Sequence, residues 1–121
     1  MATIQRFEQL DVWRLAHEWV KGVYLVTRAF PADERSGLTS QLRRAAVSVP
    51  ANIVEGFKKL GQRDKARFYN IAEASLEEAR YYLLLADELG FGSTEALRSD
   101  AERIGRMITG LIRSVTQRIG E

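Results

Sequence analysis

Apolar side chains recur every three to four positions along four segments of the chain, which is the period of an amphipathic helix. Phe30-Pro31 closes the first segment, Gly61 the second, and Gly90 with Gly92 the third. Proline cannot continue a helix and glycine commonly ends one. No segment shows the strict alternation of a half-buried strand. Because the connections are short, we predict an all-α, antiparallel up-down four-helix bundle.

Each predicted helix has an apolar face and a charged face. Asp11 is placed to cap the first helix, and Ser93 or Thr94 the fourth, because short polar side chains satisfy the free N–H groups of a first turn. The inward face of the second segment is expected to hold Leu42, Ala46, Val49, Ile53, Phe57 and Leu60. The inward face of the third is expected to hold Phe68, Ala72, Ser75, Ala79, Leu83 and Ala86.

The second segment, residues 38–60, is apolar around most of its circumference. Beyond its inward face it carries Ala45, Val47, Ala51 and Val54. A helix that is apolar on most sides is normally buried on most sides. Three partner helices of one bundle cover only part of such a helix, so we expect a subunit interface to cover the rest.

Pro50 lies in the middle of this segment. Proline removes one backbone hydrogen bond and costs about 3 kcal/mol inside a helix if nothing compensates. The alternative is two short helices, the second capped by Ser48. We favour a single helix kinked at Pro50, because the apolar stripe keeps its phase across the proline. The carbonyl near Ala46 then needs a new partner.

Ser48, Asn52 and Glu55 share one face of the same helix, at spacings of four and three. One interpretation is a binding or catalytic cluster. The other is a hydrogen-bonded network that fixes helix register and satisfies the backbone freed by the proline. We favour the network, because no second catalytic partner is evident in the sequence.

The string GLTSQLRRAAVSVPANIVEGF, followed by RFYNIAEASLEEARYYLLLADELG, resembles the four-helix-bundle proteins encoded by intervening sequences in bacterial 23S rRNA genes. The opening FEQLDVWRLAHEWVKGVYLVTRAFP is similar to the first helix of that family, so the resemblance covers about residues 7–90. The family often has Gly-Arg where this chain has Lys58-Lys59, and glycine where it has Ala74. These exchanges keep the positive charge and the small side chain.

The resemblance implies a bundle that assembles as a ring-shaped homopentamer, in agreement with the interface expected for the second helix. The function of the family is poorly defined, although its place in rRNA genes has attached a ribosomal label to it. Related bundles, the accessory variability determinants of diversity-generating retroelements, are associated with RNA and a reverse transcriptase. RNA or a nucleoprotein is therefore the partner that the resemblance implies.

Charge is spread unevenly, although the formal net charge of the chain is only +2. Residues 35–67 carry eight basic and two acidic side chains, a net +6, whereas residues 68–90 carry one basic and five acidic ones, a net −4. One interpretation is a phosphate-binding surface. The other, which we favour, is pairing of the basic and acidic helices within a bundle or between subunits, because charge runs are usually paired or solvated.

Two groups of residues are site candidates. The first is a nucleic-acid candidate, because it lies at a helix–helix turn, where side chains are commonly exposed. It consists of Lys58, Lys59, Arg63, Lys65 and Arg67. The second is an interface or polar-network candidate, because its two arginines are flanked by apolar residues. It consists of Arg43, Arg44, Ser48, Asn52 and Glu55.

No catalytic, cofactor or metal site is expected. The chain has no cysteine, which excludes disulfides, thiol chemistry and cysteine-ligated zinc. A di-iron bundle needs Glu-x-x-His on two helices, but the only histidine is His17 and the residue three before it is Arg14. The phosphate-cradling glycine motifs are also absent. We therefore predict a protein that is not an enzyme and has no small-molecule substrate.

With 121 residues, 45% of them hydrophobic and 28% charged, the chain is expected to be a single globular domain over 1–121. The N-terminus has no basic cap followed by an apolar run, and no apolar stretch reaches the roughly 18 residues of a membrane span. We expect a cytoplasmic protein without a membrane partner. The hypothesis is a homo-oligomeric scaffold or adaptor, a homopentamer as the resemblance implies, that binds RNA or a nucleoprotein through the basic turn. The alternative is a protein-only assembly module whose charges serve subunit contacts.

Overall fold

The computed structural model describes residues 3–119, and all of its regular structure is helical. Four long helices are present: α1 (Asp11–Thr27), α2 (Leu38–Lys58), α3 (Gln62–Glu88) and α4 (Glu95–Ile119). Two short 3-10 turns precede α1 and α2, at Phe7–Gln9 and Ala32–Glu34. The helix count matches the four periodic segments of the sequence.

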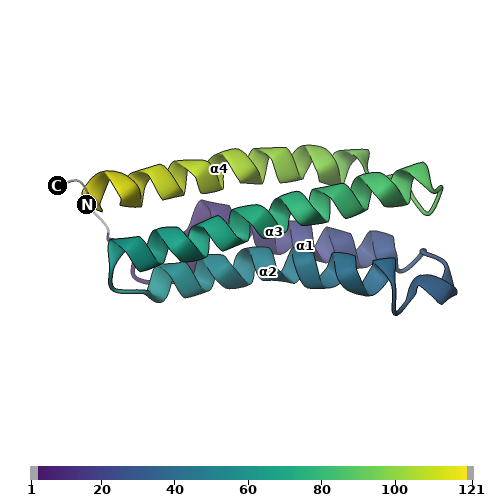
Figure 1. Cartoon of the computed structure of the whole chain (residues 1–121), viewed down its shortest axis with the longest axis horizontal. Coiled ribbons are helices and arrows are strands. Elements are labelled where there is room, and N and C mark those ends of the chain that lie inside the picture. Colours follow the sequence, from purple (N-terminus) through teal and green to yellow (C-terminus); the bar gives the residue numbers. More distant parts are fainter. Residues whose placement is uncertain (1–2, 120–121) are drawn as a thin grey trace.

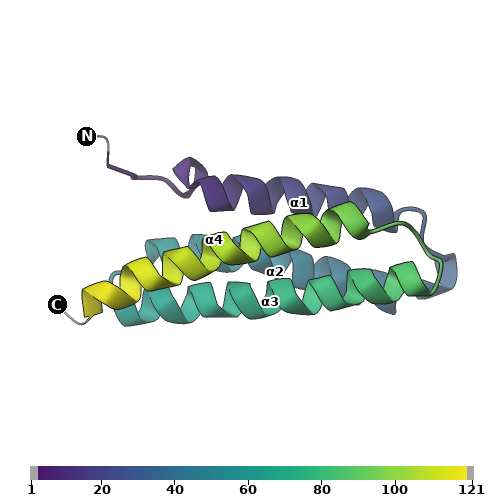
Figure 2. The ribbon, with the colours of Figure 1, turned by 90° about the horizontal axis from the view of Figure 1, so that it is seen from above.

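Successive helices run in opposite directions around the bundle (Figure 1). The α2–α3 turn lies at the same end as the start of α1 and the end of α4, and the α1–α2 and α3–α4 turns lie at the other end (Figure 2). Along the described chain α1 contacts α2 and α4, and α3 contacts the same two helices, so each helix packs against two neighbours. The predicted all-α, up-down four-helix bundle is confirmed.

The core follows a spacing of alternating three and four residues, typical of helices that pack side by side. In α2 the predicted Leu42, Ala46, Val49 and Ile53 are fully buried. The inward residues of α3 are Tyr69, Ala72, Leu76, Ala79, Leu83 and Ala86. The sequence pattern placed Phe68 and Ser75 on this face. In both cases the inward residue is instead the next one along the chain, Tyr69 or Leu76.

The turn between α2 and α3 corrects two expectations. Leu60, predicted on the inward face of the second helix, is 97% exposed, because α2 ends at Lys58 and the chain leaves the bundle there. Gly61 does not end α2 with a left-handed residue. Its backbone is extended (φ −87°, ψ 144°), and it precedes the first residue of α3. The prediction for Gly90 is correct: its φ of 78° closes α3, and the Phe91 amide then donates to the Ala86 carbonyl at 2.9 Å.

Helix α2 is continuous from Leu38 to Lys58, with Pro50 inside it and buried. The chain therefore forms one helix across the proline rather than two short ones. The kink at Pro50 stays a prediction. The side-chain amide of Asn52 donates to the Ser48 carbonyl at 2.8 Å, which is not the carbonyl near Ala46 that the proline leaves free.

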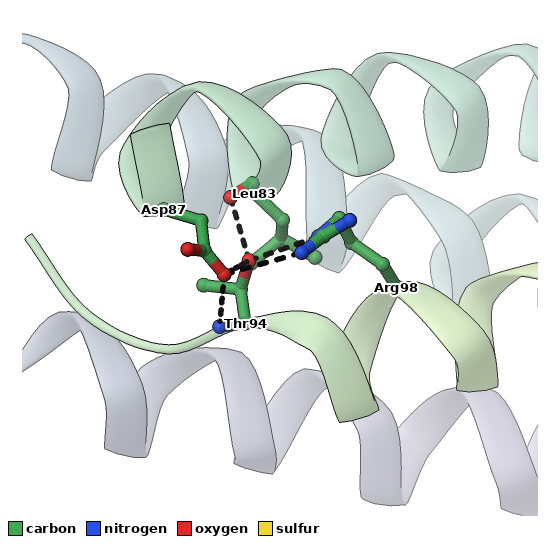
Figure 3. Close-up of polar contacts among 4 residues, drawn as sticks. All are labelled: Leu83, Asp87, Thr94 and Arg98. Carbon is green, nitrogen blue, oxygen red and sulfur yellow. Dashed lines mark hydrogen bonds and ion pairs between the residues drawn. The ribbon is translucent and has the colours of Figure 1, made fainter. Parts of the chain in front are cut away.

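The start of α4 is tied to the end of α3 by one polar cluster, shown in Figure 3. The hydroxyl of Thr94, which is buried, donates to the Leu83 carbonyl at 2.7 Å. One carboxylate oxygen of Asp87 accepts from the Thr94 amide at 2.9 Å and from the Arg98 guanidinium at 3.1 Å. Thr94 immediately precedes α4, as predicted for a cap, and the cluster fixes how α3 and α4 join.

This cluster makes the stability of the bundle depend on pH. The amide of Thr94, and next the guanidinium of Arg98, hold the pKa of Asp87 below its ordinary value. A carboxyl whose pKa falls on folding stabilises the protein above its unfolded pKa of about 3.9, and this contribution is lost as the pH falls through the folded pKa.

We therefore expect Asp87→Asn to lower the melting temperature most near neutral pH. As the pH falls below about 4 the difference from wild type should shrink progressively, because Asp87 of the wild type becomes protonated as the pH passes through its lowered folded pKa. Thermal unfolding of both proteins between pH 2.5 and 7 measures this difference. The contributions of the other carboxyls to the pH dependence cancel in the difference, because both proteins share them. A difference that stays constant over this range would contradict the assignment.

Candidate nucleic-acid interface

The candidate interface is the turn between α2 and α3, at the end of the bundle where the C-terminal part of α4 also lies (Figure 1). After Lys58, the last residue of α2, Lys59 and Gly61 adopt extended backbone and α3 begins at Gln62. Extended backbone on both sides of Leu60 carries its side chain into solvent, where it is 97% exposed. The turn therefore projects from the end of the bundle.

Lys65 differs from the other basic candidates, because its ammonium group is already used within the fold. It donates to the Phe57 carbonyl at 2.6 Å and to the Gly56 carbonyl at 3.4 Å. These carbonyls belong to the last turn of α2, whose C=O groups have no partner within the helix. Burial, and next the positive charge of Arg118, lower the pKa of Lys65. Lys65 thus closes the C-terminus of α2.

Phe68 is flanked by two cations at the start of α3. The ammonium of Lys59 lies 4.8 Å from the centre of the ring, and the guanidinium carbon of Arg67 lies 4.6 Å from it. Arg67 also forms an exposed ion pair with Asp64 at 3.7 Å. A cation near the face of an aromatic ring is attracted to it by about 0.5–1 kcal/mol at exposed sites. The ring therefore orders two of the five candidate cations without neutralising them.

Lys58 and Arg63 are exposed on either side of the turn. Neither forms an ion pair with any other residue between 3 and 119. Arg118, at the end of α4, is close enough to Lys65 to affect its pKa. The geometry thus gathers positive charge from α2, α3 and α4 at one end of the molecule, where phosphate groups of a nucleic acid could contact it.

Arg43 lies between α1 and α2. Its Nε donates to the Thr27 hydroxyl at 2.8 Å, and its guanidinium carbon lies 4.6 Å from the centre of the Tyr24 ring. Thr27 is buried, and its hydroxyl lies 2.8 Å from the Val23 carbonyl, to which it donates. Arg43 therefore holds α2 against α1 within a single chain.

The rest of the second candidate group divides in two. Ser48 and Asn52 are half-buried and hydrogen-bonded to each other, with 2.9 Å between the Asn52 amide nitrogen and the Ser48 hydroxyl. The Ser48 hydroxyl also lies 2.8 Å from the Ser75 hydroxyl, which links α2 to α3. Arg44 and Glu55 are exposed and lie outside this cluster.

Most acidic side chains of α3 have partners on α3 or α4. Arg80 forms ion pairs with Glu77 and, across the groove to α4, with Glu102 at 3.7 Å. The Thr109 hydroxyl of α4 donates to Glu73 at 2.8 Å. Along the described chain, no ion pair joins an acid of α3 to a base of α2. Pairing between these two helices within one bundle, which the charge pattern favoured, is therefore not observed.

Three residues of these sites were missed in the sequence as site residues. Ser75 and Phe68 were placed on the inward face of the third helix, and Thr27 was not singled out as a site candidate. A hydroxyl or ring at a core-facing position gives no sign of its partner, because that partner comes from another helix. The adjacent basic residues around Phe68 were the one signal in the sequence.

Within residues 3–119, no three acidic or histidine side chains lie close enough together to hold a metal ion. None of the helices that the structure describes is long and apolar enough to span a membrane.

Comparison with solved structures shows a similar bundle. A crystal structure from Bacteroides thetaiotaomicron, of a protein with unknown function from the S23 ribosomal protein family, superposes with a TM-score of 0.76. The match covers 84% of this chain and 97% of that one, at 22% sequence identity, and so shows a shared fold. No protein with curated annotation matches the sequence. The family model described as the 23S rRNA-intervening sequence protein matches residues 8–110, so the chain belongs to the 23S rRNA-intervening sequence protein family.

Proposed function

We propose that this protein is a non-catalytic, self-associating four-helix scaffold that binds RNA through the end of the bundle. The binding surface, called here the connector surface, consists of Lys58, Lys59, Arg63 and Arg67. Lys65 is left out, because its ammonium is committed to the carbonyls that end α2. The chemistry is electrostatic attraction of phosphate groups, without a reaction step.

The observation that carries the proposal is the unneutralised charge of the turn. Lys58 and Arg63 have no carboxylate partner along the described chain. Of the acids of the neighbouring α3, Asp64 forms an exposed pair with Arg67, whereas Glu77 and Asp87 pair away from the turn. Exposed cations without internal partners cost little to bring to a polyanion, because no ion pair has to be broken. The family description, which refers to 23S rRNA, supports RNA rather than another polyanion.

Self-association is supported by the outward face of α2. Val47 is 41% exposed, Ala51 is exposed and Val54 is half-buried. The helices of one bundle therefore leave apolar surface of α2 uncovered. This observation also favours the second candidate function, a module that only assembles with other protein chains. The two differ in one property, since a protein-only module would have no salt-sensitive affinity for RNA.

The test is the salt dependence of RNA binding by the wild-type protein. Each phosphate contact with single-stranded RNA contributes about −0.7 to the slope of log K against log salt concentration. Four connector cations predict a slope near −3 for each protomer that contacts the strand. Fluorescence anisotropy with a labelled single-stranded RNA between about 0.05 and 0.2 M salt measures it.

Light scattering and the ratio of absorbance at 260 and 280 nm on the purified particle complete the test. An oligomer with salt-sensitive RNA binding is the expected result. An oligomer without RNA affinity at physiological salt would favour the protein-only module, and a monomer would contradict self-association.

A further inference from the structure

A second basic site lies between α1 and α2, near the start of α2. It is an open groove of about 540 Å³, within the range of small-molecule sites. Three arginines line it, Arg35, Arg43 and Arg44, and none of its lining residues is acidic. Guanidinium groups present several N–H donors in a planar fork that suits phosphate oxygens. The groove therefore concentrates positive charge with donors that an anion can use.

Arg43 is held in place before any ligand arrives. Its Nε is bound to the Thr27 hydroxyl at 2.8 Å, and the Tyr24 ring lies beneath its guanidinium group. These contacts use only part of its five donors. An arginine that is already ordered loses less side-chain freedom when it binds an anion. The groove thus has one fixed guanidinium and two exposed ones, Arg35 and Arg44.

Thr39 adds a hydroxyl group to the groove. It lies in the first turn of α2, lines the groove and is only 7% exposed. Its hydroxyl is not sealed off from solvent and faces the open groove, so it can donate to a ligand there. At the start of α2 the Leu38 amide already donates to the Glu34 carboxylate at 3.0 Å, which offsets part of the positive potential of this helix end.

We propose that this groove binds a ligand with two or more phosphate groups. Arg43 and Arg44 bind the phosphate oxygens by charge-assisted hydrogen bonds, Arg35 adds charge at the rim, and the Thr39 hydroxyl donates to a phosphate oxygen. The groove is separate from the connector surface: Arg44 and Lys58 are fourteen residues apart in α2, which is about 20 Å along a helix. The proposal therefore does not depend on RNA binding by the connector surface.

The test is isothermal titration of the full-length protein with inorganic triphosphate at about 0.15 M salt. We expect saturable binding by the wild type. Arg44→Gln should weaken it at least tenfold, because a hydrogen bond to a charged group contributes about 1.5–3 kcal/mol. Thr39→Val keeps the shape of the side chain and should weaken binding several-fold. Arg103→Gln, an exposed arginine outside the groove, is the matched control and should bind as the wild type does.

Competition with a single-stranded RNA that lacks a 5′ phosphate identifies the source of the phosphate groups. Displacement of triphosphate points to an RNA backbone, and no displacement points to a free polyphosphate; either result supports a phosphate site. Absence of triphosphate binding, or equal weakening by Arg44→Gln and Arg103→Gln, would overturn the proposal. A third result would also overturn it: the wild type does not bind triphosphate, and Arg44→Gln dissociates the oligomer. The anion bound by Arg44 would then be a carboxylate of a second copy of the chain.

Discussion

Reversing three charges of the connector surface should remove RNA binding and leave the bundle folded. In the triple variant Lys58→Glu, Arg63→Glu, Arg67→Glu, three phosphate contacts are replaced by repulsion. Each lost contact with a charged group costs about 1.5–3 kcal/mol, so we expect affinity to fall more than 100-fold at about 0.15 M salt. The three side chains are exposed, and circular dichroism should show unchanged helix content.

The matched control reverses three exposed arginines elsewhere, Arg28→Glu, Arg103→Glu and Arg106→Glu. It changes the net charge of the chain by the same amount. If RNA binding depends on the connector surface, this variant retains most of its affinity and its steep salt dependence. Equal losses in both variants would mean that RNA responds only to total charge, and the connector surface would lose its role.

Lys65 is kept intact in this experiment because its loss would not be interpretable. Replacing it by glutamate would remove the cation that satisfies the Phe57 carbonyl and place a carboxylate there instead. The end of α2 would be disturbed together with any ligand. A loss of RNA binding would then reflect the disturbed structure of the turn and not the loss of a phosphate contact.

Gly56→Leu should be the most destabilising single substitution near the turn. A Cβ atom at Gly56 would lie 2.6 Å from Cε1 and 2.7 Å from Cδ1 of the buried Tyr69 ring. Alanine in place of glycine inside a helix normally gains about 1 kcal/mol. Here we expect Gly56→Ala to lose about 1–3 kcal/mol, and Gly56→Leu about 3 kcal/mol or more, because the core is overpacked. Urea unfolding at one fixed protein concentration measures both.

Gly110 provides the opposite case on α4. A Cβ atom there would meet no atom within 4 Å, and the residue is exposed. Gly110→Ala should therefore stabilise the protein by about 1 kcal/mol, which raises the melting temperature by about 4 °C for a domain of this size.

The contact between residue 56 and Tyr69 can be tested with a double variant. Combining Gly56→Ala with Tyr69→Val, which has a shorter side chain, should recover part of the stability lost in Gly56→Ala. If Gly56→Ala and Gly110→Ala have the same effect, the contact with Tyr69 does not constrain residue 56.

The candidate site was predictable in its location and not in the roles of its residues. Five basic residues between 58 and 67 placed a charged turn after the second helix. The sequence could not show that Lys65 turns back to the end of α2, because that contact depends on where the turn places its ammonium group. Nor could it show that Arg43 is held by Thr27 of another helix.

The sequence by itself determined the four helices, their up-down order and most of the core, because apolar side chains at a period near 3.6 can be buried on one face only. It also determined the family, through the residues around Pro50 and Ala74. The tertiary structure decided that α3 buries Tyr69 and Leu76 and that Leu60 lies in solvent. It also decided that Asp87 and Glu73 of α3 bind Arg98 and Thr109 of α4. These depend on the rotation of each helix about its axis. Packing against neighbouring helices sets that rotation. The sequence does not show it, because a contact between helices far apart in the chain leaves no periodic signal in either helix.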